Sequence, residues 1–469
     1  MGSGKTSLAI RLMREIALAY DTVFEHGQRR FIYITPFLAE VARVEGALGA
    51  IADQPIAFSP VAEDGRKLVS LNRMLLDGQN IVSTHALFKF VDENTGDALD
   101  QYRYTLFVDE VAEWVEKYPI SPKDLKILFD AGCIRTNPAT KRVEWTDPEP
   151  VEGEARGASY TGKFDSLRSL CHQGKIVASR HTTGGMPTLL LWKMPVEILA
   201  RFDEVFILTH LFDGSDMAAY LRLSGVQVTK ATIGRDGEMV PYDHSIEAER
   251  IAKIKPLLQI ETDPKLNAVG TRTGKSRPLS VTWFRTDRAK LGGHLTAKLQ
   301  SATYTFFRHR CGTPVGENLW STFNDFRKDL KGKGYGRSFL SCNARATNDY
   351  RDRVSLAYLV NLYRHPFISG YFADAGVPTS EDFYALATMT QWIFRSAIRD
   401  GKPVRLFVPS DRMRRLLVEW LDGKLPVIPE SVAAESDADT GELDSEAAKE
   451  ADSESDERVE VVDPEEQFA

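Results

Sequence analysis

The first residues of the chain have the types and spacing of a phosphate-binding loop. Gly4, Lys5 and Thr6 follow a Gly/Ser-rich start and match the second half of the motif G-x-x-x-x-G-K-[ST]. In such a loop, N–H groups at a helix N-terminus bind phosphate oxygens and the lysine reaches the β- and γ-phosphates, while the threonine hydroxyl holds Mg²⁺. The alternative is a plain flexible terminus. We assign nucleotide binding to Gly2, Ser3, Gly4, Lys5, Thr6 and Ser7, with Thr6 also holding Mg²⁺.

This motif is incomplete on its N-terminal side. Its first glycine, and the strand that normally feeds the loop, would precede Met1, so we expect a truncated start or a start codon assigned too far downstream. On the C-terminal side, apolar residues recur at helical spacing from Leu8 to Ala17 and predict the helix that the loop requires.

Two adjacent acids, Asp109 and Glu110, follow the apolar segment 104–108. A phosphate-binding loop needs one carboxylate near its threonine to hold Mg²⁺ and a second to orient the attacking water. We predict that Asp109 is the metal-side acid and Glu110 the base, the alternative being an ordinary acidic strand end.

Gln391, Arg395 and Arg399 form a third group. In a continuous helix they would share one face at i, i+4 and i+8. Stacked arginines repel each other, and an anion such as a γ-phosphate in its transition state would relieve that repulsion. The alternative is a solvated basic face, which the apolar neighbours Trp392 and Phe394 disfavour. All three residues are therefore predicted to act in catalysis.

The elements around these residues alternate between strand and helix. Expected strands end at Thr35, Thr84, Asp109 and His210, with expected helices such as 38–48 and 68–76 between them. This alternation predicts a parallel sheet with helices on both faces, in which ligands bind at the carboxyl ends of the strands.

The pattern loosens between about 123 and 203, where we expect loops and a β-hairpin insertion, with Gly184-Gly185 as a turn between segments 176–179 and 189–192. A second α/β unit is expected from about Val226. Its expected elements are a helix at 245–258, a strand at 279–284, a helix at 318–330, a strand at 338–342, a helix at 384–399, a strand at 404–408 and a helix at 412–421.

The net charge of −7 hides an asymmetry, because residues 430–469 carry −14 and the remainder carries +7. A basic body permits nucleic-acid binding, and the acidic tail cannot bury enough apolar surface to fold alone. The four cysteines are far apart, which argues against a zinc site or a disulfide framework and favours a reducing cytoplasm. No apolar run is long enough to span a membrane.

Together these motifs resemble those of superfamily 2 helicases (the DEAD/DEAH-like group), in a divergent form similar to helicases encoded by bacteriophages. The first loop matches motif I, and Val108-Asp109-Glu110-Val111 matches motif II. Thr35-Pro36 and Thr209-His210 stand where motifs Ia and III would be, and Trp283 to Arg285 where motif IV would be. Ser83-Thr84 resembles the strand-end threonine that contacts the nucleic-acid backbone in this family. Segment 343–349 resembles motif V and segment 391–399 motif VI, with Arg399 one residue later than in the family.

The resemblance implies an α/β protein with two RecA-like P-loop NTPase domains and parallel sheets. The domains would span 1–225, including the insertion, and 226–425, followed by a disordered acidic tail at 426–469. ATP and Mg²⁺ would bind between the domains, and hydrolysis would drive movement on nucleic acid, with DNA favoured over RNA. The residues implied in nucleic-acid contact are Thr35, Pro36, Thr84, Asn343 and Arg345.

Two other functions remain open. The chain could be a non-catalytic nucleic-acid-binding protein that keeps the helicase fold, or, less favoured, a viral DNA-packaging ATPase. The acidic tail could also bind a protein partner, its default role being solubility. Finally, the basic loop Lys331 to Arg337 could contact nucleic acid or be a solvated flexible loop.

Overall fold

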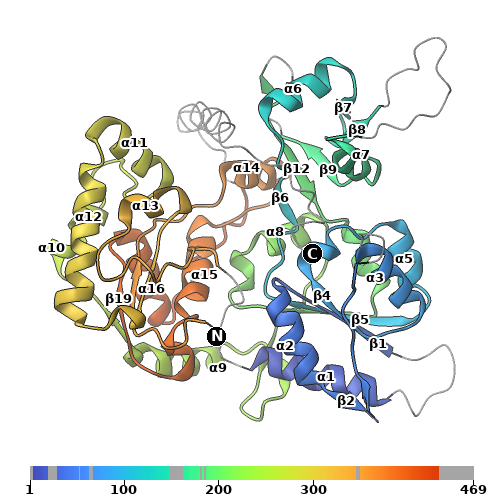
Figure 1. Ribbon diagram of the computed structural model, residues 1–469, viewed down its shortest axis with the longest axis horizontal. Helices are drawn as coiled ribbons and strands as arrows, with labels where there is room; N and C mark the ends of the chain where they lie inside the picture. The colour runs from blue at the N-terminus through green and yellow to red at the C-terminus, as the bar shows by residue number, and fades with distance from the viewer. Residues whose placement is uncertain are drawn as a thin grey trace.

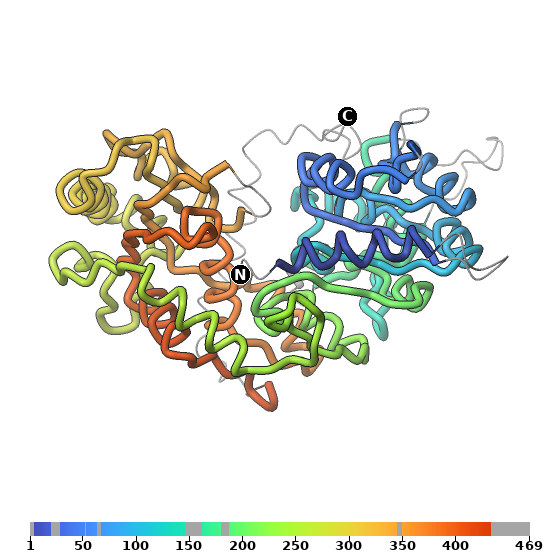
Figure 2. Tube along the Cα trace, turned by 90° about the horizontal axis from the view of Figure 1, so that it is seen from below, coloured from blue at the N-terminus to red at the C-terminus, as the bar shows by residue number. Residues whose placement is uncertain are grey.

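The computed structural model describes residues 4–19, 29–51, 53–62, 67–146, 162–179, 182–183, 186–344 and 349–432. The acidic tail beyond residue 432, and Gly184-Gly185, where we expected a turn, lie outside the described residues. The chain forms two lobes that lie side by side, each built on a parallel sheet (Figures 1 and 2). The prediction of an α/β fold with parallel sheets is confirmed.

The first lobe contains a four-stranded parallel sheet in the order β13-β5-β1-β4. The strands are β1 (Arg29–Thr35), β4 (Ile81–Thr84), β5 (Arg103–Asp109) and β13 (Glu204–Leu208). Alternate side chains of β1 and β5 enter two separate cores. One core packs against α1 (Lys5–Leu18) and α2 (Leu38–Leu48), and the other against α3 (Lys67–Leu76) and α5 (Glu93–Leu99). Short elements complete this part: β2 (Ala50–Ile51), β3 (Gln54–Pro55), α4 (His85–Phe88) and α8 (Asp216–Leu223).

A small module is inserted between β5 and β13. Its three-stranded antiparallel sheet has the order β6-β12-β9, and a separate hairpin joins β7 to β8. The expected pairing of segment 176–179 with 189–192 is present as β9 with β12. The elements are β6 (Val115–Lys117), α6 (Pro122–Asp130), β7 (Ile134–Thr136), β8 (Val143–Trp145), α7 (Asp165–His172), β9 (Ile176–Ala178), β10 (Thr182–Thr183), β11 (Met186–Pro187) and β12 (Leu190–Lys193).

The second lobe contains another four-stranded parallel sheet, in the order β16-β19-β18-β17. The strands are β16 (Leu258–Ile260), β17 (Asn318–Ser321), β18 (Ser355–Tyr358) and β19 (Val404–Phe407). One face packs on α9 (His244–Ile254), α15 (Glu381–Ile393) and α16 (Asp411–Leu421), and the other on α11 (Val281–Leu291), α12 (His294–Thr305) and α13 (Arg327–Leu330). The remaining elements are β14 (Ala231–Ile233), β15 (Met239–Pro241), α10 (Pro264–Asn267) and α14 (Pro366–Asp374).

Several predictions for the second lobe are wrong. Segment 279–284 is not a strand, because the Ser280 hydroxyl accepts a hydrogen bond from the Trp283 N–H at 3.2 Å and caps α11. Segment 318–330 is not one helix, since it begins with the fully buried strand β17. Segment 338–342 is not a strand either, and only Phe339 forms a bridge, to Trp320. Strand β16 overlaps the end of the helix expected at 245–258, and that helix ends at Ile254.

The helix expected at 384–399 ends early, at Ile393. Arg395 lies in the turn that follows, and Arg399 lies in a short 3₁₀ helix (Ala397–Asp400). Gln391, Arg395 and Arg399 therefore do not share a helix face, and the prediction of a stacked i, i+4, i+8 stripe is wrong. The cause is the extended backbone of Ser396, which lets the apolar residues on both sides of it enter the core.

Candidate active site

The N-terminus of α1 lies next to the second lobe (Figure 2). Gly4 adopts a left-handed conformation with φ 80°, which glycine tolerates best, and the Leu8 N–H donates to its carbonyl at 2.8 Å. In the described part of the chain, no side chain caps this terminus and no acid lies in its first turn, so its N–H groups can receive an anion. Thr6 is half-buried and Ser7 is exposed, whereas Gly2 and Ser3 lie outside the described residues.

Lys5 opens this helix and lies among charged groups from both lobes. Burial lowers the pKa of Lys5, and the charges of Glu247, Asp109 and Glu110 act in the opposite direction. Glu247 belongs to α9 of the second lobe, where Arg250 donates to it at 2.6 Å. Sequence reasoning missed Glu247, because nothing in the sequence distinguishes it from other helix-surface acids.

Asp109 ends strand β5 and is buried, with 8% of its surface exposed. The hydroxyl of Tyr33 on the neighbouring strand β1 donates to its Oδ2 atom. Burial raises the pKa of Asp109 to about 6 even though the Tyr33 hydrogen bond lowers it. The carboxyl is thus poorly solvated and lies beside Lys5, as a metal-side acid would be.

Glu110 is the first residue beyond β5 and has a left-handed backbone with φ 62°. A non-glycine residue in this region costs on the order of 1 kcal/mol, so the position is constrained by its surroundings. Its N–H donates to the Leu208 carbonyl at 3.1 Å, which holds the strained residue against the end of β13.

An ion pair joins the two lobes at this point. The Arg395 guanidinium, whose side chain is 8% exposed, donates to Oε1 of Glu110, which is 18% exposed. Within the part of the chain that the structure describes, the buried Glu110 Oε2 and Arg395 Nε atoms have no hydrogen-bond partner. Buried polar atoms are nearly always paired, so these two atoms can still accept a hydrogen bond from a ligand in the site and donate one to it.

Thr209 and His210 directly follow β13 and lie beside these groups. Burial lowers the pKa of His210 well below its ordinary value, with the charge of Lys5 acting in the same direction, and its ring meets the edge of Trp420 with centroids 5.9 Å apart. Among the described residues, the Thr209 hydroxyl and His210 Nε2 also lack hydrogen-bond partners. In the sequence, only the position of His210 at an expected strand end, where motif III would stand, indicated a role at the site.

The other predicted site residues lie differently. Gln391 is half-buried in α15, and Arg399 is exposed, its pKa lowered first by burial and then by the Arg395 charge. Thr35 is buried at the end of β1 and Pro36 is half-buried. The Thr84 hydroxyl caps α4 by accepting from the Leu87 N–H at 3.3 Å.

Asn343, from the expected motif V, is not part of this group. Asn343 is exposed and accepts a hydrogen bond from the Ser341 hydroxyl at 2.6 Å. Arg345 lies outside the described residues. The structure therefore groups Lys5, Asp109, Glu110 and Arg395 near α1, whereas Thr35 and Thr84 lie opposite each other at the ends of the neighbouring strands β1 and β4.

The group at α1 combines an open helix N-terminus and a lysine with two carboxylates and an arginine, a set that suits a phosphate with a divalent cation. The described residues contain no cluster of three or more His, Cys, Asp or Glu side chains able to hold a metal. A cation here would be held by Asp109 and the Thr6 hydroxyl, with its other ligands from phosphate and water, as is common for Mg²⁺.

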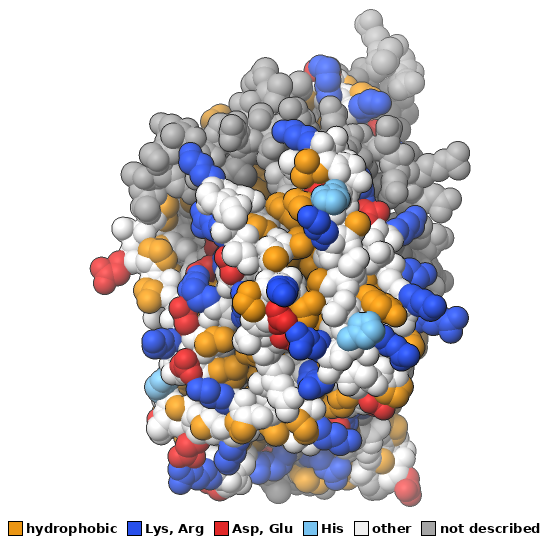
Figure 3. Space-filling view, turned by 90° about the vertical axis from the view of Figure 1, so that its left-hand side faces the viewer, with side chains coloured by type: hydrophobic (Ala, Val, Ile, Leu, Met, Phe, Trp, Pro, Cys, Tyr) orange, Lys and Arg blue, Asp and Glu red, His pale blue; other side chains and the backbone are white. Residues whose placement is uncertain are grey.

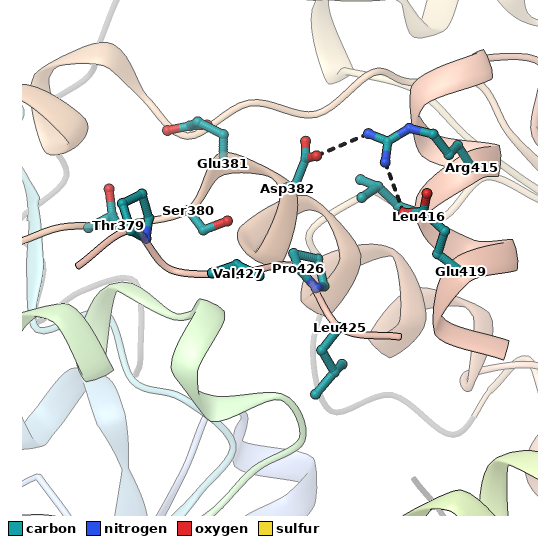
Figure 4. A pocket seen from close by; sticks show the side chains of 11 residues that line it. Thr379, Ser380, Glu381, Asp382, Arg415, Leu416, Glu419, Leu425, Pro426 and Val427 are labelled. Atoms are coloured by element: carbon teal, nitrogen blue, oxygen red, sulfur yellow. Dashed lines mark hydrogen bonds and ion pairs between the residues drawn. The ribbon is translucent and has the colours of Figure 1, made fainter. Parts of the chain in front are cut away.

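A groove of about 470 Å³ lies elsewhere, between the start of α15 and the segment that follows α16 (Figure 4). Its charged side chains are already paired, with Arg415 bound to Asp382 at 3.0 Å and to Glu419 at 2.8 Å. We assign no chemistry to it. No helix of the described residues is long and apolar enough to cross a bilayer.

Fold and site together define a mixed α/β protein with a group of charged side chains between two lobes, each built on a parallel sheet. The chain belongs to the YonV family. Residues 115–192 match the family model of the YonV middle domain, and residues 252–421 match that of the YonV C-terminal Rossmann-like domain. The chain is 33% identical over 428 residues to the SPbeta prophage-derived uncharacterized protein YonV of Bacillus subtilis strain 168, covering 90% of this chain and 97% of that protein.

These matches agree with the bacteriophage-type character expected from the motifs, and they identify the second lobe as Rossmann-like. The middle-domain model covers β6 to β12, close to the insertion that we expected at 123–203.

Proposed function

We propose that the chain is an ATP-dependent nucleic-acid motor of the helicase type, with two RecA-like domains that correspond to the two lobes. ATP and Mg²⁺ would bind where α1, β5 and the turn after α15 meet. The observation that carries this proposal is the Arg395–Glu110 ion pair, because it brings the arginine expected in one domain to the acid expected in the other.

Each side chain has a definite task in this proposal. The α1 N-terminus and Lys5 bind the phosphates, and Thr6 and Asp109 hold Mg²⁺. Glu110 accepts a proton from the attacking water, and Arg395 stabilises the charge that spreads over the transferred phosphoryl group. Thr209 and His210, at the end of β13, supply a donor and a neutral imidazole beside the phosphates.

Hydrolysis would be coupled to movement through the lobes. An arginine of the second lobe that leaves Glu110 for the γ-phosphate changes the contact between the lobes, and loss of that phosphate restores its pair with Glu110. Nucleic acid bound across both lobes would then be gripped differently in the two states, largely through its backbone.

The test is ATP hydrolysis with and without single-stranded DNA or RNA, for the wild type and for Lys5→Ala, Glu110→Gln and Arg395→Ala. We expect hydrolysis that nucleic acid stimulates and that each substitution reduces at least a hundredfold. Lys253→Ala, an exposed lysine on α9, serves as the matched control and should hydrolyse normally. Normal hydrolysis by Glu110→Gln would refute the assignment of the base.

A non-catalytic nucleic-acid-binding protein of the same fold is the second candidate. The observation that favours it is the same ion pair, since a carboxylate that is paired with an arginine is a weaker base toward water. Nucleotide and nucleic-acid binding without hydrolysis by the wild type would select this candidate.

A further inference from the structure

The segment between β16 and the end of the loop after α13 is strongly basic. Residues 261–337 contain 15 Lys and Arg and 6 Asp and Glu, a net charge of +9. This segment alone therefore exceeds the +7 carried by residues 1–429 as a whole. Figure 3 looks onto this side of the second lobe, where Lys and Arg side chains are more numerous than acidic ones.

The acids of this segment are mostly engaged within it. Asp287 is buried and accepts from the Thr296 N–H at 2.8 Å and from the Thr296 hydroxyl at 2.6 Å, which fixes the turn between α11 and α12. Asp329 pairs with Arg288 at 2.5 Å, and Asp263 pairs with Arg310. These acids therefore stabilise the scaffold and do not neutralise its outer face.

Seven cations of this segment lie on α11, α12 and α13 and in the segments that directly follow α12 and α13, and we call them the basic surface. Each is exposed, and no ion pair joins any of them to another described residue. They are Lys290, Lys298, Arg308, Lys328, Lys331, Lys333 and Arg337. Like charges gathered in this way repel each other, and an anionic partner with repeated charges would relieve the repulsion.

The scaffold presents these charges in fixed positions. The Gln300 side chain of α12 donates to the Lys331 carbonyl at 2.9 Å and to the Asp329 carbonyl at 3.2 Å, which ties the basic loop to the helix. Within that loop, Tyr335 is fully buried, and its hydroxyl donates to the Leu330 carbonyl at 2.6 Å.

The glycines of the loop are required by this arrangement. A Cβ atom on Gly332 would lie 2.5 Å from the Tyr335 ring, and one on Gly336 would lie 2.8 Å from the Gly332 carbonyl oxygen. The loop is therefore closely packed around Tyr335, which favours a preformed loop over the flexible one that the sequence left open. A preformed surface loses less entropy when it binds.

We propose that the basic surface binds the phosphate backbone of nucleic acid, as a second contact region in addition to Thr35 and Thr84 at the ends of β1 and β4. This inference extends the proposed function, since it gives the proposed motor a contact with nucleic acid that does not depend on bound nucleotide. A membrane is a poorer match, because α11 and α12 bury Phe284 and Leu299 in the core and present no broad apolar face.

The test is binding of labelled DNA and RNA, single-stranded and duplex, by the full chain without nucleotide at several salt concentrations. The variant is Lys290→Gln/Lys298→Gln/Lys333→Gln. Its matched control is Lys253→Gln/Lys402→Gln/Lys424→Gln, three exposed lysines of the same lobe with the same change in net charge. Equal unfolding midpoints for the three proteins establish that folding is intact.

We expect the surface variant to bind duplex at least tenfold more weakly and to reduce the slope of log K against log salt by about 2 to 3, while the control changes neither. Equal losses in both triple variants would overturn the proposal, because only net charge would then matter. It would also be overturned if the surface variant lost binding to phosphatidylserine vesicles but not to nucleic acid. If the affinity for nucleic acid rises with salt concentration, the acidic tail occupies the basic surface, and the proposal is also overturned.

The outcomes separate this inference from the proposed function. If the wild type does not hydrolyse ATP, yet the surface variant loses affinity, the motor proposal fails and the basic surface stands. If hydrolysis is stimulated by nucleic acid, yet both triple variants bind like the wild type, the basic surface fails and the motor proposal stands.

Discussion

The hydrogen bond from Tyr33 to Asp109 is the contact of the candidate site whose removal gives the sharpest expected result. Both residues are buried, and the tyrosine hydroxyl donates to the carboxyl Oδ2. Tyr33→Phe removes only this hydroxyl. Its matched control is Tyr104→Phe on β5, where an equally buried hydroxyl donates to two neutral carbonyls, of Gln79 at 3.1 Å and of Leu75 at 3.3 Å.

The expected magnitude depends on pH because Asp109 ionises. Its pKa in the folded chain is raised to about 6 from 3.8, so the folded state binds the proton more tightly than the unfolded state does. The free energy of unfolding therefore falls as pH rises from about 4 to 6, and above 6 the cost of a buried carboxylate is fully present.

Tyr33 lowers the pKa of Asp109, so Tyr33→Phe must raise it further. A hydrogen bond to a charged group contributes about 1.5–3 kcal/mol, against about 1 kcal/mol to a neutral one. We expect Tyr33→Phe to shift the ionisation equilibrium of Asp109 about tenfold toward the protonated form. The variant should then lose about 1 kcal/mol at pH 5 and about 2.4 kcal/mol at pH 8, a difference of about 1.4 kcal/mol.

Urea unfolding at pH 5 and pH 8, followed by tryptophan fluorescence and by circular dichroism, measures both losses. Tyr104→Phe should lose about 1 kcal/mol at each pH, since its partners do not titrate. If Tyr33→Phe also loses the same amount at the two pH values, Asp109 is not the buried acid that we infer, and its assignment to the metal loses its physical basis.

Three further predictions follow from the structure. Arg364→Met should destabilise the chain by about 3 kcal/mol in urea unfolding, because the 2%-exposed guanidinium holds Asp216 at 2.5 Å, whereas Arg415→Met at an exposed ion pair should cost less than 1 kcal/mol. The pKa of His210 is lowered in the folded chain, so below the ordinary pKa of 6.5 the unfolded state takes up a proton that the folded state does not. Between pH 7.5 and pH 5.5 the unfolding free energy of the wild type should therefore fall by about 1.4 kcal/mol more than that of His210→Asn. Gly332→Ala should cost about 1–3 kcal/mol and weaken duplex binding, whereas Gly316→Ala, whose added Cβ would lie 3.8 Å from its nearest neighbour, should do neither.

The first lobe was predictable because its signals are local and mutually consistent. Strands such as β1 and β5 are continuous apolar runs between amphipathic helices, and α2 runs from Leu38 to Leu48 as expected. The carboxyl ends of parallel strands meet at one edge of a sheet, so the position of Asp109 and Glu110 could be expected from the strand pattern alone.

The second lobe was harder to predict because it buries segments on both faces. Strand β17 is fully buried although it begins with Asn318 and ends with Ser321, and a segment of that length does not reveal its period. Helix α11 begins where Ser280 caps it, although its residues Val281 to Phe284 favour a strand. A single side-chain hydrogen bond reversed the preference of a short apolar segment.

The position of Arg395 shows a different limit. Arg395 reaches Glu110 because α15 ends at Ile393. A continuous helix would instead have placed Arg395 on the same helix face as Arg399. The charge pattern identified the residue but not the geometry, because a helix end without glycine or proline leaves little trace in the sequence.

The Glu110–Arg395 ion pair also bears on how a ligand would act at this site. Removing either charge would leave the other charge largely buried without a partner, which destabilises the folded chain. One member of the pair can therefore be released only if another ion takes its place. An anion at the α1 N-terminus is such an ion, since it can take Arg395 from Glu110 and free the carboxylate for water. Under the proposed function, the same contact therefore holds the lobes together without nucleotide and keeps the base inactive until a phosphate arrives.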